Sequence, residues 1–248
     1  MTENTKFAIT FDTDWAPDWM MNEIASILIS NEVKSTWFVT HNSPFLTVIR
    51  ENPNLFEIGI HPNCFPGSTQ GGSEDEILAN LKESAPEAIS MRTHGLYQST
   101  NFLVKAALEY GIKIDASLFL PRMDYITPHL FAWREAKLYR VPFFWSDDLE
   151  CFQEDPLFRF SLSKFTGAGL KIFNFHPIHI MLNTARFKTY EKLKSLNLAP
   201  NQYTKDVIDK HRWSGDGPQG LFMDLIEYLG PGGFFLYELI DDRVKKKL

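Results

Sequence analysis

The sequence predicts one α/β domain over residues 1–248, folded as a distorted (β/α) barrel of about seven parallel strands. Three observations support this fold class. Short apolar runs rich in strand-forming residues alternate with segments whose apolar side chains recur at helical spacing. The length of 248 residues suits a single α/β barrel. The sequence contains no Gly/Ser-rich linker and no fixed-period repeat that would divide the chain.

Strand and helix alternate in the first part of the chain. The runs KFAITF, STWFVT and LFEIGI predict strands at residues 6–11, 35–40 and 55–60. After the first strand, Met20, Ile24 and Leu28 recur at helical spacing and predict a helix with one apolar face. Ser73 and Glu76 have the pattern of a capping box, which predicts the start of a second helix.

The alternation continues through the second part of the chain. Further strands are predicted at residues 88–91, 113–117, 139–145, 170–175 and 234–239. Helices are predicted at 102–110, where Gly111 supplies a C-terminal stop, and at 220–229. The weakly patterned stretch 183–217 predicts an excursion over one end of the barrel, with a helix around 186–196.

The overall charge argues against one class of partner. The formal net charge is -6, whereas nucleic-acid binding depends on clustered Lys and Arg that neutralise phosphates. The one basic run in the sequence is Lys245–Lys247, which we interpret as a solvated tail. We therefore expect no nucleic-acid partner.

The sequence also indicates a compartment. No stretch of 18 apolar residues predicts a membrane span, and the first residues contain no apolar signal-peptide core. Cys64 and Cys151 are too few for a disulfide framework, and reduced thiols are favoured over a single bridge. We expect a cytoplasmic protein, and the sequence leaves its oligomeric state open.

Residues able to do chemistry follow directly after the predicted strands. They are Asp12 and Asp14 after the first strand, His61 after the third, His94 just past the fourth, Asp147 and Asp148 after FFW, and His176 after KIFNF. Consecutive strands of a parallel barrel end on one face, so these residues are expected to converge there. A single His at a strand end is usually structural, but three His and two acidic pairs in this register favour a functional site.

The residue types suit a metal site. One Asp and two His, supplied by Asp14, His61 and His94, can hold Zn²⁺ or another divalent first-row metal and leave positions open for water and substrate. A second carboxylate, Asp12, can accept a proton from the attacking water. Residues i and i+2 of a strand share a face, so Asp12 and Asp14 are expected to point into one pocket.

From residue 6 to residue 177 the sequence resembles the polysaccharide deacetylase family, also called NodB-homology or chitin-deacetylase-like carbohydrate esterases. The opening motif TFDTD at residues 10–14 is similar to the family's Thr-Phe-Asp-Asp, with Thr13 inserted between the carboxylates. The resemblance implies the NodB-homology barrel. It also implies that Asp12 is the catalytic base and Asp14 a metal ligand.

The second motif departs from the family at one ligand. The resemblance implies that His61 is the first metal-binding His, but four residues later, where the family has its second His, this chain has Phe65. Three interpretations follow: an inactive site, a site with two ligands, or a replacement from elsewhere. His94 is the favoured replacement, because it occupies the place of the family's third motif. Cys64 and Asn63, in the loop after His61, are the alternatives.

The third motif supplies two further assignments by resemblance. Arg92 matches the family's Arg, which pairs with the catalytic carboxylate and would hold Asp12 ionised and oriented. Tyr97, in the same motif, is expected to contact substrate.

The last two motifs complete the resemblance. Trp145, Asp147 and Asp148 resemble the family's fourth motif, which lines the pocket and tunes the catalytic His; for Trp145 a core position is an equal alternative. His176, in NFHP, matches the family's last motif and is expected to be the general acid toward the leaving amine.

These expectations combine into a predicted activity. The chain is expected to be a metal-dependent hydrolase that removes an N-acetyl group from an amino sugar, with Zn²⁺ favoured over Co²⁺, Ni²⁺ or Mn²⁺. A backbone N–H near residues 95–96 is expected to help stabilise the oxyanion. An unexported enzyme would act on a nucleotide-linked, lipid-linked or oligosaccharide precursor of a surface polysaccharide. The alternatives are an amidase for a small non-sugar substrate and an inactive sugar-binding homologue, but retention of both Asp12 and His176 favours an enzyme.

Overall fold

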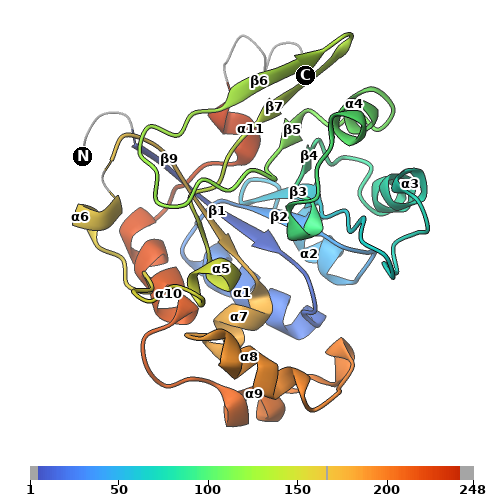
Figure 1. Ribbon diagram of the computed structural model, residues 1–248. Helices are drawn as coiled ribbons and strands as arrows, with labels where there is room; N and C mark the ends of the chain where they lie inside the picture. The colour runs from blue at the N-terminus through green and yellow to red at the C-terminus, as the bar shows by residue number, and fades with distance from the viewer. Residues whose placement is uncertain (1–4, 166, 241–248) are drawn as a thin grey trace.

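The structure is a computed structural model that describes residues 5–165 and 167–240 (Figure 1). The basic run Lys245–Lys247, interpreted above as a solvated tail, lies outside the described residues. Within the two described ranges, none of the helices has the length and apolar character needed to cross a bilayer.

A nine-stranded sheet forms the centre of the protein, in the order β6-β7-β5-β4-β3-β2-β1-β9-β8. The strands are β1 (Thr5–Asp12), β2 (Ser35–Val39), β3 (Phe56–Ile60), β4 (Ser90–Met91), β5 (Ile114–Asp115), β6 (His129–Trp133), β7 (Ala136–Arg140), β8 (Trp145–Ser146) and β9 (Gly169–Phe175). All neighbours pair in parallel except β6 and β7. The sheet curls into a half-barrel whose edge strands are β6 and β8, which confirms the predicted α/β class and its parallel strands.

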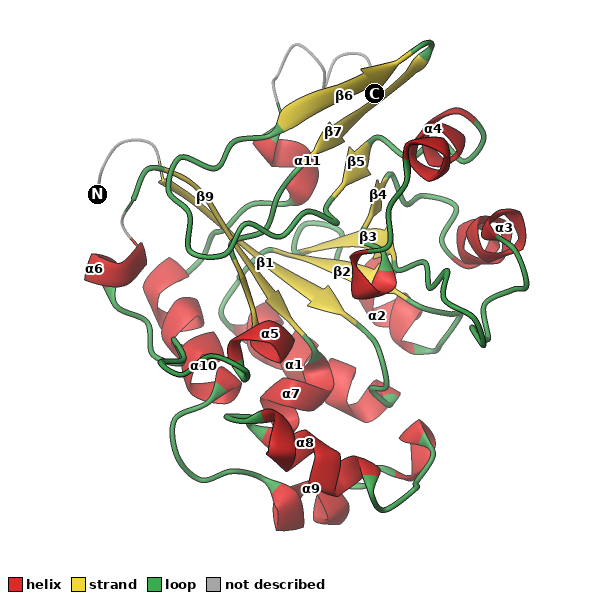
Figure 2. Cartoon of the chain, viewed as in Figure 1, coloured by secondary structure: helices red, strands yellow, loops and turns green. Residues whose placement is uncertain are grey.

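Helices surround this sheet (Figure 2). They are α1 (Asp18–Ser30), α2 (Phe45–Glu51), α3 (Glu74–Ser84), α4 (Thr100–Leu108), α5 (Asp147–Glu150), α6 (Leu162–Phe165), α7 (Pro177–Leu182), α8 (Phe187–Lys194), α9 (Lys205–His211), α10 (Pro218–Leu229) and α11 (Leu236–Leu239), with 3₁₀ turns η1 (His94–Leu96) and η2 (Pro200–Gln202). The predicted excursion carries α8 and α9, which pack beneath α7 at the lower end of the molecule in Figure 1.

Local signals fix where the helices begin and end. Ser73 Oγ accepts a hydrogen bond from the backbone N–H of Glu76 and so caps α3 as predicted. The Glu76 carboxylate reaches back to the N–H of Gly72 rather than to Ser73. Gly111, with φ of 68°, adopts the left-handed conformation shortly after α4, where the sequence predicts a stop.

Two predicted strands are wrong in detail. The predicted strand 139–145 is divided between β7 and β8, because Pro142 has no N–H to continue the ladder. The predicted strand 234–239 is instead the helix α11, whose first N–H, that of Leu236, donates to the buried Glu57 carboxylate at 2.8 Å. A short apolar run has the same pattern in a buried helix as in a buried strand.

The central strands place the polar residues at one edge. Every residue of β2 and β3 is buried, and the last six residues of β1 are buried as well. In the sheet register Asp12 lies beside Phe38 of β2, and Phe11 lies beside Phe175 of β9. The carboxyl ends of β1, β2 and β9 are therefore level, which brings Asp12 next to the residue after β9, His176.

Candidate active site

Three side chains from three strand ends converge beside β1. Asp14 follows β1, His61 follows β3, and His94 follows β4 within η1. Asp14 Oδ2 lies 2.7 Å from His61 Nε2 and 3.1 Å from His94 Nδ1. One potential ligand atom from each residue lies within 4.8 Å of the others. The structure therefore brings together the three residues that the sequence predicts as metal ligands.

The surroundings of His61 test whether this cluster suits a metal ion. The His61 side chain is 2% exposed, yet neither ring nitrogen makes a hydrogen bond to any described residue. Its Nε2 faces Asp14 Oδ2 at 2.7 Å, but the two atoms are not aligned as a hydrogen bond. Buried polar atoms are normally satisfied. An unsatisfied imidazole nitrogen beside a carboxylate oxygen fits a cation held between them, and the donor set suits Zn²⁺.

The charges in the cluster are mutually stabilising. Burial acts to raise the pKa of Asp14, but His61 and His94 hold it well below its ordinary range. Burial acts to lower the pKa of His61, whereas the carboxylates of Asp14 and Asp12 raise it. The site therefore favours an ionised Asp14, which is the form that binds a cation.

The alternative ligands after β3 are less suited to a metal. Burial raises the pKa of Cys64 to about 11, so it is a neutral thiol at neutral pH rather than the thiolate that binds metals. Among the described residues, Cys64 is not part of the group of potential ligands formed by Asp14, His61 and His94. Asn63 Oδ1 accepts a hydrogen bond from the backbone N–H of Phe65 at 3.1 Å.

Phe65, at the position of the family's second His, packs against His94, the residue predicted to replace that His. Its ring centroid lies 6.2 Å from that of His94, and the two rings meet edge to face. Gly95, with φ of 56°, permits this contact, because a Cβ there would lie 2.6 Å from the Phe65 ring. The N–H of Leu96 donates to Thr93 within this turn, so the Gly95 N–H is the remaining candidate of the predicted oxyanion donors.

Asp12 lies between the ligand cluster and a second His. Its Oδ1 lies 3.1 Å from an Arg92 nitrogen and 3.6 Å from His61 Nδ1. Its Oδ2 accepts a hydrogen bond from Asn174 Nδ2 at 2.8 Å and lies 3.7 Å from His176 Nε2. Burial acts to raise the pKa of Asp12, but Arg92, His61 and His176 outweigh it and lower that pKa. The carboxylate is therefore ionised and held from both sides.

Arg92 is itself held rigidly, because its side chain is 1% exposed. Its guanidinium lies between the rings of Phe38 and Phe143, 4.6 Å from each centroid. Its Nε donates to the Ala116 carbonyl at 3.1 Å. Gly59 leaves space for the Phe38 ring, because a Cβ at residue 59 would lie 2.6 Å from that ring. The structure thus pairs Arg92 with Asp12, as the resemblance implies.

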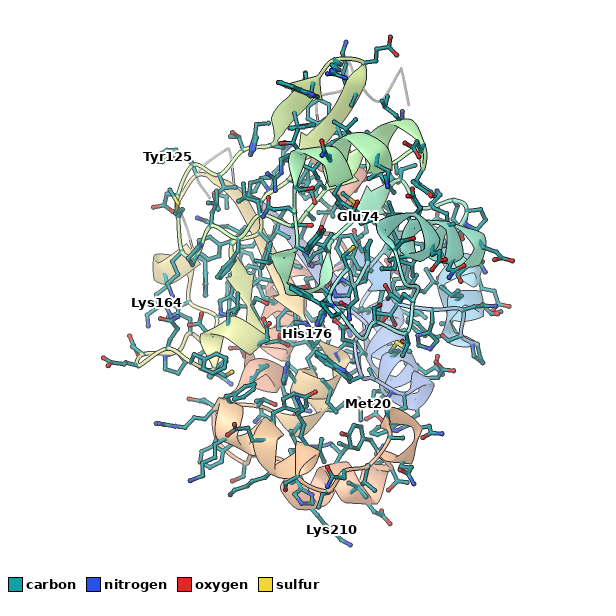
Figure 3. All side chains as sticks on the ribbon, turned by 45° about the vertical axis from the view of Figure 1, so that its right-hand side comes forward. Met20, Glu74, Tyr125, Lys164, His176 and Lys210 are labelled. Atoms are coloured by element: carbon teal, nitrogen blue, oxygen red, sulfur yellow. The ribbon has the colours of Figure 1, made fainter. Side chains whose placement is uncertain are left out.

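His176 is oriented by the residues that follow β8. Asp147 accepts two hydrogen bonds from His176, one from Nδ1 and one from the backbone N–H, each at 2.7 Å. Burial acts to lower the pKa of His176, but Asp147, Asp148 and Asp12 raise it to about 10. The imidazole is therefore protonated at neutral pH, with Nε2 directed toward Asp12. His176 lies near the centre of the molecule in Figure 3.

The remaining predicted residues surround this centre at different depths. Trp145 is 0% exposed, and its Nε1 donates to the Leu157 carbonyl, so its indole packs in the core below the site. Tyr97 is half-buried and donates its hydroxyl hydrogen to Glu74 at 2.7 Å. Asp148 accepts a hydrogen bond from Ser146 and adds negative charge near His176.

Two residues that the sequence analysis did not single out hold the predicted base Asp12 and its partner Arg92 in place. Thr10 Oγ1 and Asn174 Oδ1 both accept hydrogen bonds from Arg92, the first at 2.9 Å. They lie opposite each other in the β1–β9 register. A signal was present, because each lies two residues before a predicted catalytic residue, Asp12 or His176, and so on the same strand face.

Comparison with known proteins agrees with this fold. Residues 9–194 match the family model described as WbmS-like polysaccharide deacetylase. The class is thus that of the polysaccharide deacetylases. Within it, the chain belongs to the WbmS-like family, because the match covers well over half of the sequence. Among curated proteins none is significantly similar to this chain.

Solved structures add one informative relative. The WbmS protein of Bordetella bronchiseptica, described as a polysaccharide deacetylase involved in O-antigen biosynthesis, is 30% identical, with a TM-score of 0.76 and coverage of 90% of each chain. Peptidoglycan deacetylase PdaC of Bacillus subtilis is 13% identical over 99% of this chain and 93% of its own, with a TM-score of 0.48. At that level of likeness PdaC adds nothing to the assignment.

Proposed function

We propose that this protein is a metal-dependent deacetylase that removes an N-acetyl group from an amino sugar. The observation that carries the proposal is the position of Asp12, 3.6 Å from His61 Nδ1 on one side and 3.7 Å from His176 Nε2 on the other. A carboxylate base thus lies between a cluster suited to a metal and a protonated imidazole, which is the arrangement that amide hydrolysis requires.

Asp14, His61 and His94 would hold the divalent cation, with Zn²⁺ favoured and Co²⁺, Ni²⁺ or Mn²⁺ as alternatives. When bound there, such a cation polarises an amide carbonyl and makes water easier to deprotonate. The protein supplies the pre-arranged ligands, so little reorganisation of these side chains is needed.

The protein's own residues move the protons. Asp12 is the base that accepts a proton from the attacking water, and Arg92 and Asn174 keep its carboxylate oriented. His176 carries a proton on Nε2 and gives it to the departing nitrogen, because an unprotonated amine is a poor leaving group. Asp147 fixes the ring through Nδ1 and stabilises the charged form.

The substrate we propose is an intracellular precursor of a surface polysaccharide, carried on a nucleotide or a lipid or present as an oligosaccharide. Two observations support it: the family is that of polysaccharide deacetylases, and the Bordetella relative is described as acting in O-antigen biosynthesis. We place the reaction in the cytoplasm, in keeping with the sequence, and expect no nucleic-acid partner.

Two measurements test the proposal. Mass spectrometry of purified protein should find one divalent metal per chain in the wild type and a reduced content in His94→Ala; a wild type without stoichiometric metal would contradict the proposal.

Acetate release should be measured on N-acetylated sugar nucleotides, N-acetylated oligosaccharides and small non-sugar amides. Turnover of the small amides alone would favour an amidase, and turnover undiminished in Asp12→Asn would overturn the mechanism.

A further inference from the structure

Trp15, directly after the predicted ligand Asp14, has an unusual backbone. Its φ is 53°, in the left-handed region that bulky side chains rarely occupy. Such a conformation is strained, and residues of this kind gather at functional sites. Burial of the indole does not explain the conformation, because 43% of Trp15 is exposed.

The strained backbone places the Trp15 ring beside the candidate active site. Its centroid lies 5.3 Å from that of His94, with the rings edge to face. On another side it lies 6.3 Å from Tyr190 of α8. An exposed aromatic ring therefore contacts a proposed metal ligand and joins it to the excursion.

A cation completes this surface. Lys194 Nζ lies 6.0 Å from the Trp15 ring and 5.4 Å from the Tyr190 ring, within the range of cation–π contact. Among the described residues, no carboxylate forms an ion pair with Lys194. Its charge is thus available to a ligand that lies on the exposed Trp15 ring.

We infer that Trp15 and Lys194, which both pack against the buried Tyr190, form a binding surface for a sugar ring with an anionic substituent, a carboxylate or a phosphate. The apolar face of a pyranose would stack on the exposed Trp15 indole, and Lys194 would contact the anionic group. This inference rests on the proposed function, because it names the substrate class of the same site.

The test separates strain from binding by replacing Trp15 with Gly, which adopts a left-handed φ without steric cost. Binding to the metal-loaded full chain is measured by calorimetry with three probes: neutral N,N′-diacetylchitobiose, N-acetylglucosamine 1-phosphate and 2-acetamido-2-deoxyglucuronic acid. Trp15→Gly should bind all three about tenfold more weakly, which corresponds to about 1.4 kcal/mol. Its thermal midpoint should equal or exceed that of the wild type.

Matched variants isolate the cation. Lys194→Gln should lose the preference for the anionic probes and keep the affinity for the neutral one, whereas Lys192→Gln on the same helix should behave as the wild type. The two anionic probes show whether carboxylate or phosphate is preferred. Wild-type affinity in Trp15→Gly, or equal binding of neutral and anionic probes by the wild type, would overturn the inference. Because binding of the probes does not require turnover, a lack of acetate release would contradict the proposed function alone.

Discussion

Arg92 and Asp12 form an ion pair of 3.1 Å in which the side chains are only 1% and 5% exposed. A buried pair of this kind adds little stability compared with an apolar pair of the same shape, but removal of one partner leaves the other charge uncompensated. The pair therefore links the stability of the fold to the charge of the proposed base.

Arg92→Met should lower the free energy of unfolding by about 3 to 5 kcal/mol. It should also raise the pKa of Asp12, because Arg92 is the largest influence that lowers it. Urea titration measures the first effect, and the acidic limb of the pH–rate profile, moved to higher pH, measures the second. The control is Arg159→Met, because Arg159 forms a largely exposed ion pair with Asp224. This variant should lower the free energy of unfolding by at most about 1 kcal/mol.

Asp147→Asn should move the alkaline limb of the pH–rate profile to lower pH. Asp147 is the largest influence that raises the pKa of His176 to about 10, so its neutral form removes stabilisation of the imidazolium. The general acid then loses its proton at a lower pH. Asp209→Asn, at an exposed surface pair, should leave the profile in place. An unmoved limb in Asp147→Asn would exclude His176 as the general acid.

His94→Ala should weaken metal binding by at least about tenfold, since even residues that only orient metal ligands contribute that much. The double variant His94→Ala/Phe65→His returns an imidazole to the position where the family has it, next to the vacated ring, and should recover part of the affinity. Metal titration with a competing chelator measures both. His41→Ala, an exposed His outside the cluster, is the control. Equal affinity in wild type and His94→Ala would remove His94 from the ligand set.

Glu57→Gln should change the pH dependence of stability. Burial raises the pKa of Glu57 from 4.5 to about 7, so between these values the folded chain retains a proton that the unfolded chain releases. The free energy of unfolding of the wild type therefore falls as the pH rises from about 4.5 to 7, by roughly 3 kcal/mol from this group. Gln can still accept the hydrogen bonds from Thr36 and Leu236. Urea titrations at pH 4.5 and 7 should show a smaller fall in the variant, and an identical fall would exclude a protonated Glu57.

The parts of the fold that sequence reasoning predicted are those with a regular pattern. The strands β1, β2, β3 and β9 are predominantly apolar, because both faces of the sheet are covered, and their carboxyl ends fix where Asp12 and His176 lie. The first strand of the β6–β7 hairpin, HLFAW, is absent from the predicted strands, and its apolar residues are mostly exposed rather than part of the core.

The sequence indicates which residues form the candidate site, but it does not show how their side chains pack against neighbouring aromatic rings. Strand ends and motifs together pointed to Asp14, His61 and His94. The 4.6 Å stacking of Arg92 on Phe38 depends on how two strands pack, and periodicity does not reveal such packing. The position of Trp15 beside Tyr190 joins residues 175 positions apart, through an excursion whose sequence has little pattern.

The proposed use of His94 in place of a His at position 65 has a mechanical consequence. In the family pattern two ligands come from one loop, whereas here Asp14, His61 and His94 belong to three separate crossover connections, after β1, β3 and β4. A bound ion would act as a cross-link that ties these connections together at the open end of the half-barrel. Occupancy of the metal site and resistance to heat are then coupled, and without metal this end of the half-barrel would unfold first.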